Sequence, residues 1–334
     1  MSRLVIHSVA DVDESLTLEP DPNLTVGEGE LLVEMEAATI NLTDFRFAAG
    51  TYTDRIDVRL PSPIGGEGVG RVTEAGPGTD ASLLGHRVII LPTYEQGTWA
   101  DRTVVAERNV VPVDDDGDVQ QLCMLPINPP TAYHLLTRYA ALNPGDWIGQ
   151  DMGNSAVGKY VIALARHFGW QTLSVVRRED AAAELRSLGA DLVVVDGDGL
   201  KDRITDALAG AHLRLVLDGV GGTVAGDLAH ALEFGGQVIS YSSLTRTPVA
   251  VQSGDLVYRE LGVRGYWLIN WVRSAPRAEI LATYGELEAL VRRGVISATV
   301  AATYPLADFR EAFKAARQPQ RSGKVLFTFD DASH

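Results

Sequence analysis

The chain has 334 residues, of which 46% are hydrophobic and 22% are charged, so it is long enough for two globular domains and too apolar for a disordered protein. Its formal net charge of −15 excludes a broadly basic surface, which argues against nucleic acid as the main partner. The single cysteine, Cys123, excludes an intrachain disulfide and a zinc site built from several thiolates.

No apolar run in the sequence is long enough to span a bilayer. The N-terminal segment MSRLVIHSVADVDES has neither the apolar core of a signal peptide nor the Arg-rich, acid-poor composition of a transit peptide. We therefore expect a soluble cytoplasmic protein with no membrane partner.

The first 115 or so residues predict a compact unit that resembles a β-barrel. Short apolar or alternating runs are separated there by Gly, Pro and Asp, as is typical of strands joined by tight turns. These runs are RLVIHS (3–8), ELLVEMEAAT (30–39), GVGRVTEAG (68–76) and GHRVIILP (85–92).

From about Met124 the pattern changes to strands that alternate with helices. The predicted strands are 146–152, 172–177, 192–196, 213–218 and 236–242, and the predicted helices between them include 156–169, 181–189 and 224–236. Nearly continuous Val, Ile and Leu in these strands is typical of a parallel sheet covered on both faces. The alternation predicts an α/β fold with a doubly wound sheet.

The end of the chain is predicted to return to the first domain. A long helix over 277–294 and a last helix over 309–317 precede the strand KVLFTF (324–329), which could complete the first sheet. We therefore assign 1–120 and 272–334 to the barrel-like domain and 121–271 to the doubly wound domain.

The segment GNSAVG joins the first strand of the second domain to the helix that follows. Gly153 and Gly158 bracket a tight connection whose backbone N–H groups would face an anion at the helix N-terminus, and Ser155 adds a hydroxyl donor. Between them, Asn154, Ala156 and Val157 complete a candidate nucleotide-binding turn. The alternative is a glycine-rich turn with no ligand.

The next strand ends in Arg177 and Arg178. The adenosine ribose of a dinucleotide lies over the end of this strand, where an acidic residue would bind free ribose hydroxyls. Two guanidinium groups suit a 2′-phosphate instead, which favours NADPH over NADH. The alternative is a solvated basic loop beside Glu179 and Asp180.

Several segments in order along the chain resemble one known superfamily, the medium-chain dehydrogenases/reductases. Within it, the chain is similar to the 2-enoyl thioester reductases of the mitochondrial fatty-acid-synthesis type. The similar segments include INLTDFRFAAGTYTDRI (40–56), LPSPIGGEGVGRV (60–72), LPINPPTAYHLL (125–136), GDWIGQDMGNSAVGKYVIALA (145–165) and RGYWLINW (264–271). The chain departs from the usual family residues at Ala156, Leu42 and Gly66, where Gly, Pro and Asn are more common.

The resemblance implies a GroES-like catalytic domain, a Rossmann domain for NADPH and a homodimer formed through edge strands of the Rossmann domain. It places Tyr52 at the position of the family's catalytic tyrosine, with Asn41 and Thr131 as further catalytic candidates. It also implies that Tyr241 and Trp267 contact the cofactor. The alternatives are that Tyr52 only packs a turn and that the aromatic residues near Trp267 form ordinary core.

The resemblance implies that the protein catalyses NADPH-dependent reduction of a C=C bond conjugated to a carbonyl. The substrates that it favours are 2-enoyl thioesters of coenzyme A or acyl carrier protein. Zinc-dependent members of the superfamily use Cys and His ligands, and this chain has one Cys, no C-x-x-C and no plausible ligand triplet around residues 40 to 70, so we expect no metal. One alternative is a quinone or enone oxidoreductase. Another is a non-catalytic NADPH-binding protein.

Overall fold

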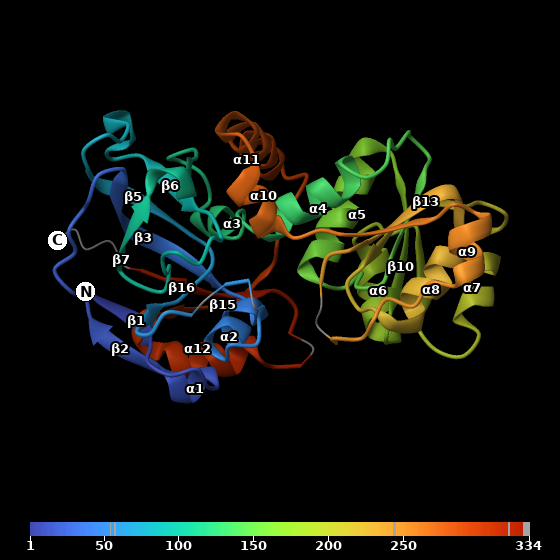
Figure 1. The fold of residues 1–334 in the computed structure, drawn as a ribbon, viewed down its shortest axis with the longest axis horizontal. Coiled ribbons are helices and arrows are strands. Elements are labelled where there is room, and N and C mark those ends of the chain that lie inside the picture. Colours follow the sequence, from blue (N-terminus) through green and yellow to red (C-terminus); the bar gives the residue numbers. More distant parts are fainter. Residues whose placement is uncertain (54, 57, 243–244, 320, 330–334) are drawn as a thin grey trace. The chain divides into compact units, whose positions relative to one another are not determined.

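The computed structural model describes residues 1–53, 55, 56, 58–242, 245–319 and 321–329. The chain divides into two compact units: unit 1 comprises Met1–Ile127 and Ile269–His334, and unit 2 comprises Asn128–Leu268. Unit 1 contains a three-stranded and a seven-stranded sheet, and unit 2 contains a six-stranded sheet (Figure 1). Within the described ranges, every helix is too short or too polar to cross a lipid bilayer.

Unit 1 is rich in strands. Its first segment contains β1 (Ser2–Ile6), α1 (Val12–Ser15), β2 (Leu16–Pro20), β3 (Glu30–Ile40), α2 (Leu42–Ala48), β4 (Ser62–Pro63), β5 (Gly68–Ala75), η1 (Ala81–Leu83), β6 (Arg87–Ile90), β7 (Arg102–Ala106), η2 (Glu107–Asn109), β8 (Val110–Pro112) and α3 (Val119–Cys123). Its second segment contains most of α10 (Leu268–Ser274), then α11 (Arg277–Arg292), β15 (Val300–Pro305), η3 (Leu306–Asp308), α12 (Phe309–Ala316) and β16 (Lys324–Thr328).

The larger sheet of unit 1 has the strand order β15-β16-β3-β5-β6-β8, and β7 also pairs with β3. The C-terminal strand β16 lies antiparallel to β3, with Val325 opposite Ile40. The prediction that the segment KVLFTF completes the first domain is therefore confirmed.

The core of unit 1 is built around Trp99, which is fully buried. Its ring lies 5.2 Å from that of Phe313 and 5.5 Å from that of Phe327, and its Nε1 donates to the Thr39 carbonyl at 3.1 Å. Phe313 comes from α12, whose apolar residues recur at helical spacing and face this core. Trp99 is thus a core residue of unit 1.

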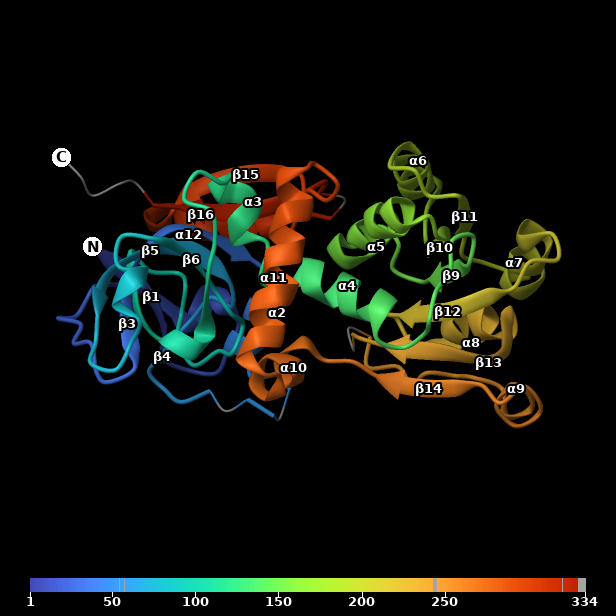
Figure 2. The same cartoon turned by 90° about the horizontal axis from the view of Figure 1, so that it is seen from above.

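Unit 2 is a doubly wound α/β domain. It contains α4 (Asn128–Thr137), β9 (Trp147–Gln150), α5 (Ala156–Phe168), β10 (Gln171–Val176), α6 (Glu179–Ser187), β11 (Leu192–Val195), α7 (Leu200–Leu208), β12 (Leu213–Asp218), α8 (Gly222–His230), β13 (Leu232–Ser240), α9 (Ser253–Tyr258) and β14 (Gly262–Gly265). Its six strands are parallel, in the order β11-β10-β9-β12-β13-β14. Figure 2 shows β12, β13 and β14 side by side.

Alternate residues of each strand in unit 2 face different helices. Leu173 and Val175 of β10 pack with α7 and α8, whereas Val176 packs with α5 and α6. Helices therefore cover both faces, as the apolar strands predicted. The α/β fold class, with a GroES-like domain and a parallel Rossmann sheet, is confirmed.

One predicted helix is too long. The pattern predicts a helix over 224–236, but α8 ends at His230 and β13 begins at Leu232, which pairs with Leu213 of β12. Gly235, with φ of 74°, is one reason that the helix does not continue through this segment. Helix α7 lies between β11 and β12, and its buried residues are Leu200, Ile204 and Leu208.

Candidate active site

The turn after β9 has the form expected of a dinucleotide-binding turn. Ser155 is the N-cap of α5, and its Oγ accepts from the backbone N of Gly158 at 3.0 Å. A Cβ at Gly158 would lie 2.4 Å from the Met152 carbonyl oxygen, and one at Gly153 would lie 2.7 Å from Leu185. Both glycines are therefore required by close packing of the helix on the turn.

The other residues of the turn remain accessible. Asn154 is exposed, and Ser155, Ala156 and Val157 are half-buried at the first turn of α5. Tyr241 follows β13 and its hydroxyl makes a hydrogen bond with the Ser155 side chain. Burial, followed by the charge of Asp151, raises the pKa of Tyr241, so its phenol stays protonated and able to donate.

Arg177 and Arg178 lie where the sequence predicted them, directly after β10. Both are exposed. The Nε of Arg178 donates to Asp180 at 3.0 Å, whereas Arg177 makes no ion pair with any residue that the structure describes. The Arg177 guanidinium is thus available to an anionic ligand, and together with the turn it fits the phosphates of NADP(H).

Thr131 and Trp267 both belong to unit 2. Thr131 is buried in the first turn of α4, and Trp267 is half-buried between β14 and α10. The neighbouring Tyr266 is buried, and its hydroxyl lies 2.8 Å from Nδ1 of His134. Tyr266 is therefore a core residue of unit 2, and the aromatic segment leads into a helix and not along a strand.

Tyr52 lies in unit 1, in the segment after α2. It is half-buried against the core, and its ring centroid is 5.7 Å from that of Tyr94. Tyr94 stacks on Phe47 at 4.8 Å and donates to Oδ1 of Asp44 at 3.4 Å. Burial, followed by the charge of Asp44, raises the pKa of Tyr94 well above its usual value.

Tyr94 also explains the glycine at position 66. A Cβ at Gly66 would lie 2.9 Å from the Tyr94 hydroxyl and 3.1 Å from Oδ1 of Asp44. Tyr94 itself has a left-handed φ of 57°, a conformation that is uncommon for a bulky residue. The phenol of Tyr94 therefore occupies space that a side chain at Gly66 would need.

Asn41 is the centre of a buried polar cluster in unit 1. Its Nδ2 donates to Oε1 of Glu67 at 2.8 Å, and its Oδ1 accepts from the ammonium of Lys324. Its backbone N donates to Oδ2 of Asp44 at 2.8 Å, which completes the N-terminal cap of α2. Asn41 is thus the N-cap residue, and Asp44 supports it from the third helical position.

The charges of this cluster balance only if a carboxyl keeps its proton. Burial raises the pKa of Asp44 to about 7 and that of Glu67 to about 8, although the charge of Lys324 opposes both shifts. Burial also lowers the pKa of Lys324, against the attraction of Glu67. One cation faces two buried carboxyls, so near neutral pH the cluster holds a proton on one of them.

The cluster does not fit a zinc ion. No three His, Cys, Asp or Glu side chains among the described residues are arranged to hold a metal. Asp44 and Glu67 are engaged with backbone amides, Asn41 and Lys324, and the Cys123 thiol is buried, with a pKa raised by that burial.

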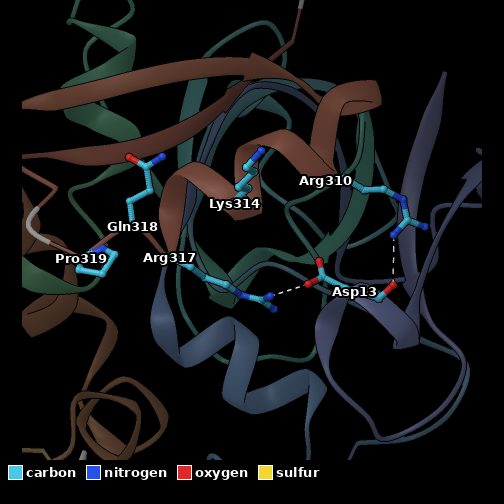
Figure 3. Close-up of a pocket in the computed structure, with 6 residues that line it drawn as sticks. All are labelled: Asp13, Arg310, Lys314, Arg317, Gln318 and Pro319. Carbon is cyan, nitrogen blue, oxygen red and sulfur yellow. Dashed lines mark hydrogen bonds and ion pairs between the residues drawn. The ribbon is translucent and has the colours of Figure 1, made fainter.

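A surface hollow of unit 1 beside α12 lies apart from these residues. Figure 3 shows Arg310 and Arg317 reaching toward Asp13, with Lys314 and Gln318 nearby. Arg317 is paired with Asp11 and Asp13, and Lys314 with Glu311. None of the candidate active-site residues lines this hollow.

The sequence pointed to Asn41 and Tyr52 but not to Glu67, Tyr94 or Lys324 as their neighbours. Glu67 gave one signal, because an acidic residue between Gly66 and Gly68 interrupts an otherwise apolar segment. Lys324 gave none, since it lies 283 residues from Asn41 and the two residues meet only through the pairing of β16 with β3.

Comparison with known families and proteins gives a consistent result. Residues 27–115 match the alcohol dehydrogenase GroES-like domain, and residues 156–283 match the family described as zinc-binding dehydrogenase. The chain is 33% identical over 307 residues to the mitochondrial enoyl-[acyl-carrier-protein] reductase of Xenopus tropicalis, covering 90% of this chain and 87% of that protein. It is 31% identical to the protein of the same name from Homo sapiens, covering 90% and 81%.

Solved structures share the whole fold. A structure described as a putative NADPH:quinone reductase from Bacillus thuringiensis superposes with a TM-score of 0.90 at 25% identity, covering 98% of this chain and 99% of that one. A mitochondrial 2-enoyl thioester reductase heterodimer from Candida tropicalis superposes with a TM-score of 0.83 at 21% identity, also covering 98% and 99%.

Proposed function

Because the chain belongs to the zinc-free enoyl reductase branch of the medium-chain dehydrogenases/reductases, we propose that it catalyses NADPH-dependent reduction of the C=C bond of 2-enoyl thioesters. The observation that carries this proposal is the turn of residues 153–158 followed, one strand later, by the exposed guanidinium of Arg177. We take these residues as the site for a phosphorylated dinucleotide, and the resemblance to the family makes Tyr52 the candidate catalytic tyrosine of the same chain.

The cofactor is NADP(H), and we propose NADPH as the form used. Backbone N–H groups at the start of α5 would bind the pyrophosphate, and Ser155, held as the N-cap, keeps its O–H to donate. Arg177, with Arg178 beside it, would bind the 2′-phosphate. When NADPH is bound, the hydride that reduces the β-carbon comes from its nicotinamide ring.

Tyr52 is proposed as the proton donor. Addition of hydride to the β-carbon leaves an enolate, whose oxygen needs hydrogen-bond donors and whose α-carbon needs a proton. A neutral phenol can supply either one, and water can return the proton to it afterwards. Roles for Asn41 and Thr131 in the reaction stay predictions. Asn41 already accepts from Lys324 and donates to Glu67.

A quinone or enone is the second candidate substrate. The observation that favours it is the similarity to the protein described as a putative NADPH:quinone reductase, with a TM-score of 0.90. Occupation of the space at Gly66 by Tyr94 also departs from the usual enoyl reductase pattern, so the substrate can differ while the chemistry is kept.

The function is tested by following NADPH oxidation with short and long trans-2-enoyl-CoA esters and with a simple quinone. We expect turnover with an enoyl-CoA ester, and much less when NADH replaces NADPH. Turnover with the quinone alone would move the assignment to the second candidate. Saturable NADPH binding without turnover on any substrate would instead indicate a non-catalytic binding protein.

The preference for NADPH is expected to depend on Arg177. Replacing Arg177 and Arg178 by Ala removes charge-assisted hydrogen bonds worth about 1.5–3 kcal/mol each, so KM for NADPH should rise about 10- to 100-fold. KM for NADH should change little, because NADH has no 2′-phosphate. Arg214→Ala is the matched control, since Arg214 is a half-buried arginine of unit 2 that is paired with Glu233. Equal effects on both cofactors would contradict the assignment.

A homodimer is proposed through the edge strand β14. Val263 on this strand is 43% exposed, and Val257 and Tyr258 on α9 are 67% and 82% exposed. An open strand edge flanked by apolar side chains is a typical pairing surface. Sedimentation velocity should give twice the chain mass of 35.9 kDa, and Val263→Lys should give the monomer. Leu188→Lys, at an exposed residue outside this surface, should leave the dimer intact.

A further inference from the structure

Two buried aspartates meet at the edge of the unit 2 sheet. Asp151 directly follows β9, Asp218 is the last residue of β12, and these two strands are neighbours with Gln150 paired to Leu217. Strand β10 lies beside β9 on one side, and β12, which comes later in the chain, lies beside β9 on the other side. The aspartates therefore lie at the switch point of the topology, where doubly wound folds bind their ligands.

Each carboxyl group holds the loop that follows β12. Oδ1 of Asp151 accepts from the backbone N of Gly219 at 2.7 Å, and Oδ1 of Asp218 accepts from the backbone N of Gly221 at 2.7 Å. Gly221 has a φ of 76°. The two carboxyl oxygens thus hold the loop of residues 219–221 in place. Within this loop, Gly221 has a left-handed backbone conformation that favours glycine.

The remaining oxygen of each carboxyl group is buried and has no donor. Oδ2 of Asp151 and Oδ2 of Asp218 both lack a hydrogen-bond partner among the described residues, although the two side chains are within hydrogen-bonding reach of each other. Two ionised carboxylates cannot satisfy this arrangement, since both would only accept. A single proton held between them satisfies both oxygens and removes one of two adjacent negative charges.

Among the residues that the structure describes, no cation is recorded as acting on Asp151 in place of that proton. The strongest influences on Asp151 are its burial, the Asp218 side chain and the backbone N–H groups of Gly219 and Val220. The other titratable group that faces the pair is Tyr241, which stays neutral. Burial, followed by the hydrogen bond with Asp218, raises the pKa of Asp151 to about 8.

The pair is linked through its neighbours to the turn that we assign to the cofactor. Met152, next to Asp151, packs its carbonyl oxygen against Gly158 and its sulfur against Gly219, so a Cβ at these glycines would lie 2.4 and 2.6 Å away. Tyr241, whose hydroxyl bonds Ser155, lies against Gly219 as well. The turn of residues 153–158 and the loop of residues 219–221 therefore meet through Met152 and Tyr241, beside the two carboxyl groups.

We propose that Asp151 and Asp218 share one proton and act as positioning residues for the bound cofactor, so that affinity for NADP(H) falls when this proton is lost. The inference rests on the proposed function, because it takes the turn of residues 153–158 as the pyrophosphate site. Loss of the proton leaves two adjacent carboxylates, which repel each other and add negative charge beside the cofactor phosphates. Both effects weaken binding and neither acts on the chemical step.

The test measures Kd for NADPH by fluorescence titration between pH 6.5 and 9.5 in wild type and Asp151→Asn. In wild type, Kd should stay level up to about pH 8 and then rise by up to about tenfold per pH unit. Asp151→Asn should flatten this rise, because the amide N–H₂ donates to Asp218 as the shared proton does and cannot ionise. KM for NADPH should follow the same profile, while kcat at saturating NADPH should not.

Asp191→Asn is the matched control. Asp191 also accepts from a backbone N, that of Thr172 at 2.8 Å, but it has no carboxyl partner among the described residues, so this variant should keep the wild-type profile. A wild-type Kd that is level to pH 9.5, or an unchanged rise in Asp151→Asn, would overturn the shared proton while leaving the proposed function in place. No NADPH binding by any form at any pH would overturn the cofactor site itself, and the positioning role with it.

Thermal unfolding without cofactor gives an independent readout. The raised pKa of Asp151 means that the folded state keeps a proton between about pH 4 and 8 that the unfolded state releases. Wild type should therefore lose stability as pH rises through this window, relative to Asp151→Asn. The difference in Tm between the variant and wild type should grow from pH 5 to 8 and then stay constant. A difference independent of pH would contradict the shared proton.

Discussion

Tyr52→Phe is expected to lower kcat for reduction of a trans-2-enoyl-CoA ester by about 100-fold or more, the usual contribution of a positioned proton donor. The substitution removes only the hydroxyl, so the ring still packs beside Tyr94 at 5.7 Å and against the core of unit 1. Kd for NADPH should stay unchanged, because the proposed cofactor site belongs to unit 2. Steady-state kinetics with an independent binding titration separate the two effects.

Tyr304→Phe is the matched control for this prediction. Tyr304 is also half-buried against the core of unit 1, but it lies on β15 and has no proposed role in catalysis. It should keep wild-type kcat within about twofold, as expected for a substitution that costs little packing. If Tyr52→Phe also kept wild-type kcat on every accepted substrate, Tyr52 would be only a packing residue.

Lys324→Met is expected to destabilise the protein by about 3–5 kcal/mol, because it leaves the buried carboxyls of Asp44 and Glu67 without their cation. For a domain of this size, Tm should fall by roughly 6–20 °C. The loss should be larger at pH 8 than at pH 5. At pH 5 both carboxyls hold protons in the folded state, since their pKa values are raised to about 7 and 8, and need no cation.

Two further variants make this prediction specific. Lys314→Met changes an exposed lysine whose nearest carboxylate, Glu311, is 4.0 Å away, so it should cost less than about 1 kcal/mol. Adding Glu67→Gln to Lys324→Met removes one uncompensated carboxyl and should restore part of the lost stability. Strictly additive effects of Lys324→Met and Glu67→Gln would show that the two residues do not interact.

Features set by nearby residues could be predicted from the sequence. The apolar strands of unit 2, the turn of residues 153–158 and the arginines after β10 all follow from residues within one strand-turn-helix segment. The overlong helix over 224–236 shows the limit of such reasoning. Its Ala and Leu pattern continues past His230, but pairing of Leu232 with β12 determines the conformation there.

Features that depend on distant residues could not be predicted. Asp151 and Asp218 each end a recognisable strand, but only the parallel pairing of β9 with β12 brings them together. The sequence shows Gly66 only as a departure from the usual family residue. The reason for this departure is that Tyr94, from a different segment, occupies the space that a side chain at position 66 would need. In both cases the feature depends on two residues that are distant in sequence and adjacent in space, and a single sequence does not show which residues are adjacent.

The position of β16 in the middle of the unit 1 sheet has a consequence for folding during synthesis. Unit 2 is continuous in sequence, so all its strands have emerged once residue 268 leaves the ribosome. Unit 1 must wait for residues 324–328, because β16 lies between β15 and β3 and brings Lys324 to the carboxyls of Asp44 and Glu67. Until then residues 37–40 of β3 lack their β16 partner and two buried acids lack their cation, so unit 1 is the part of the nascent chain most exposed to aggregation.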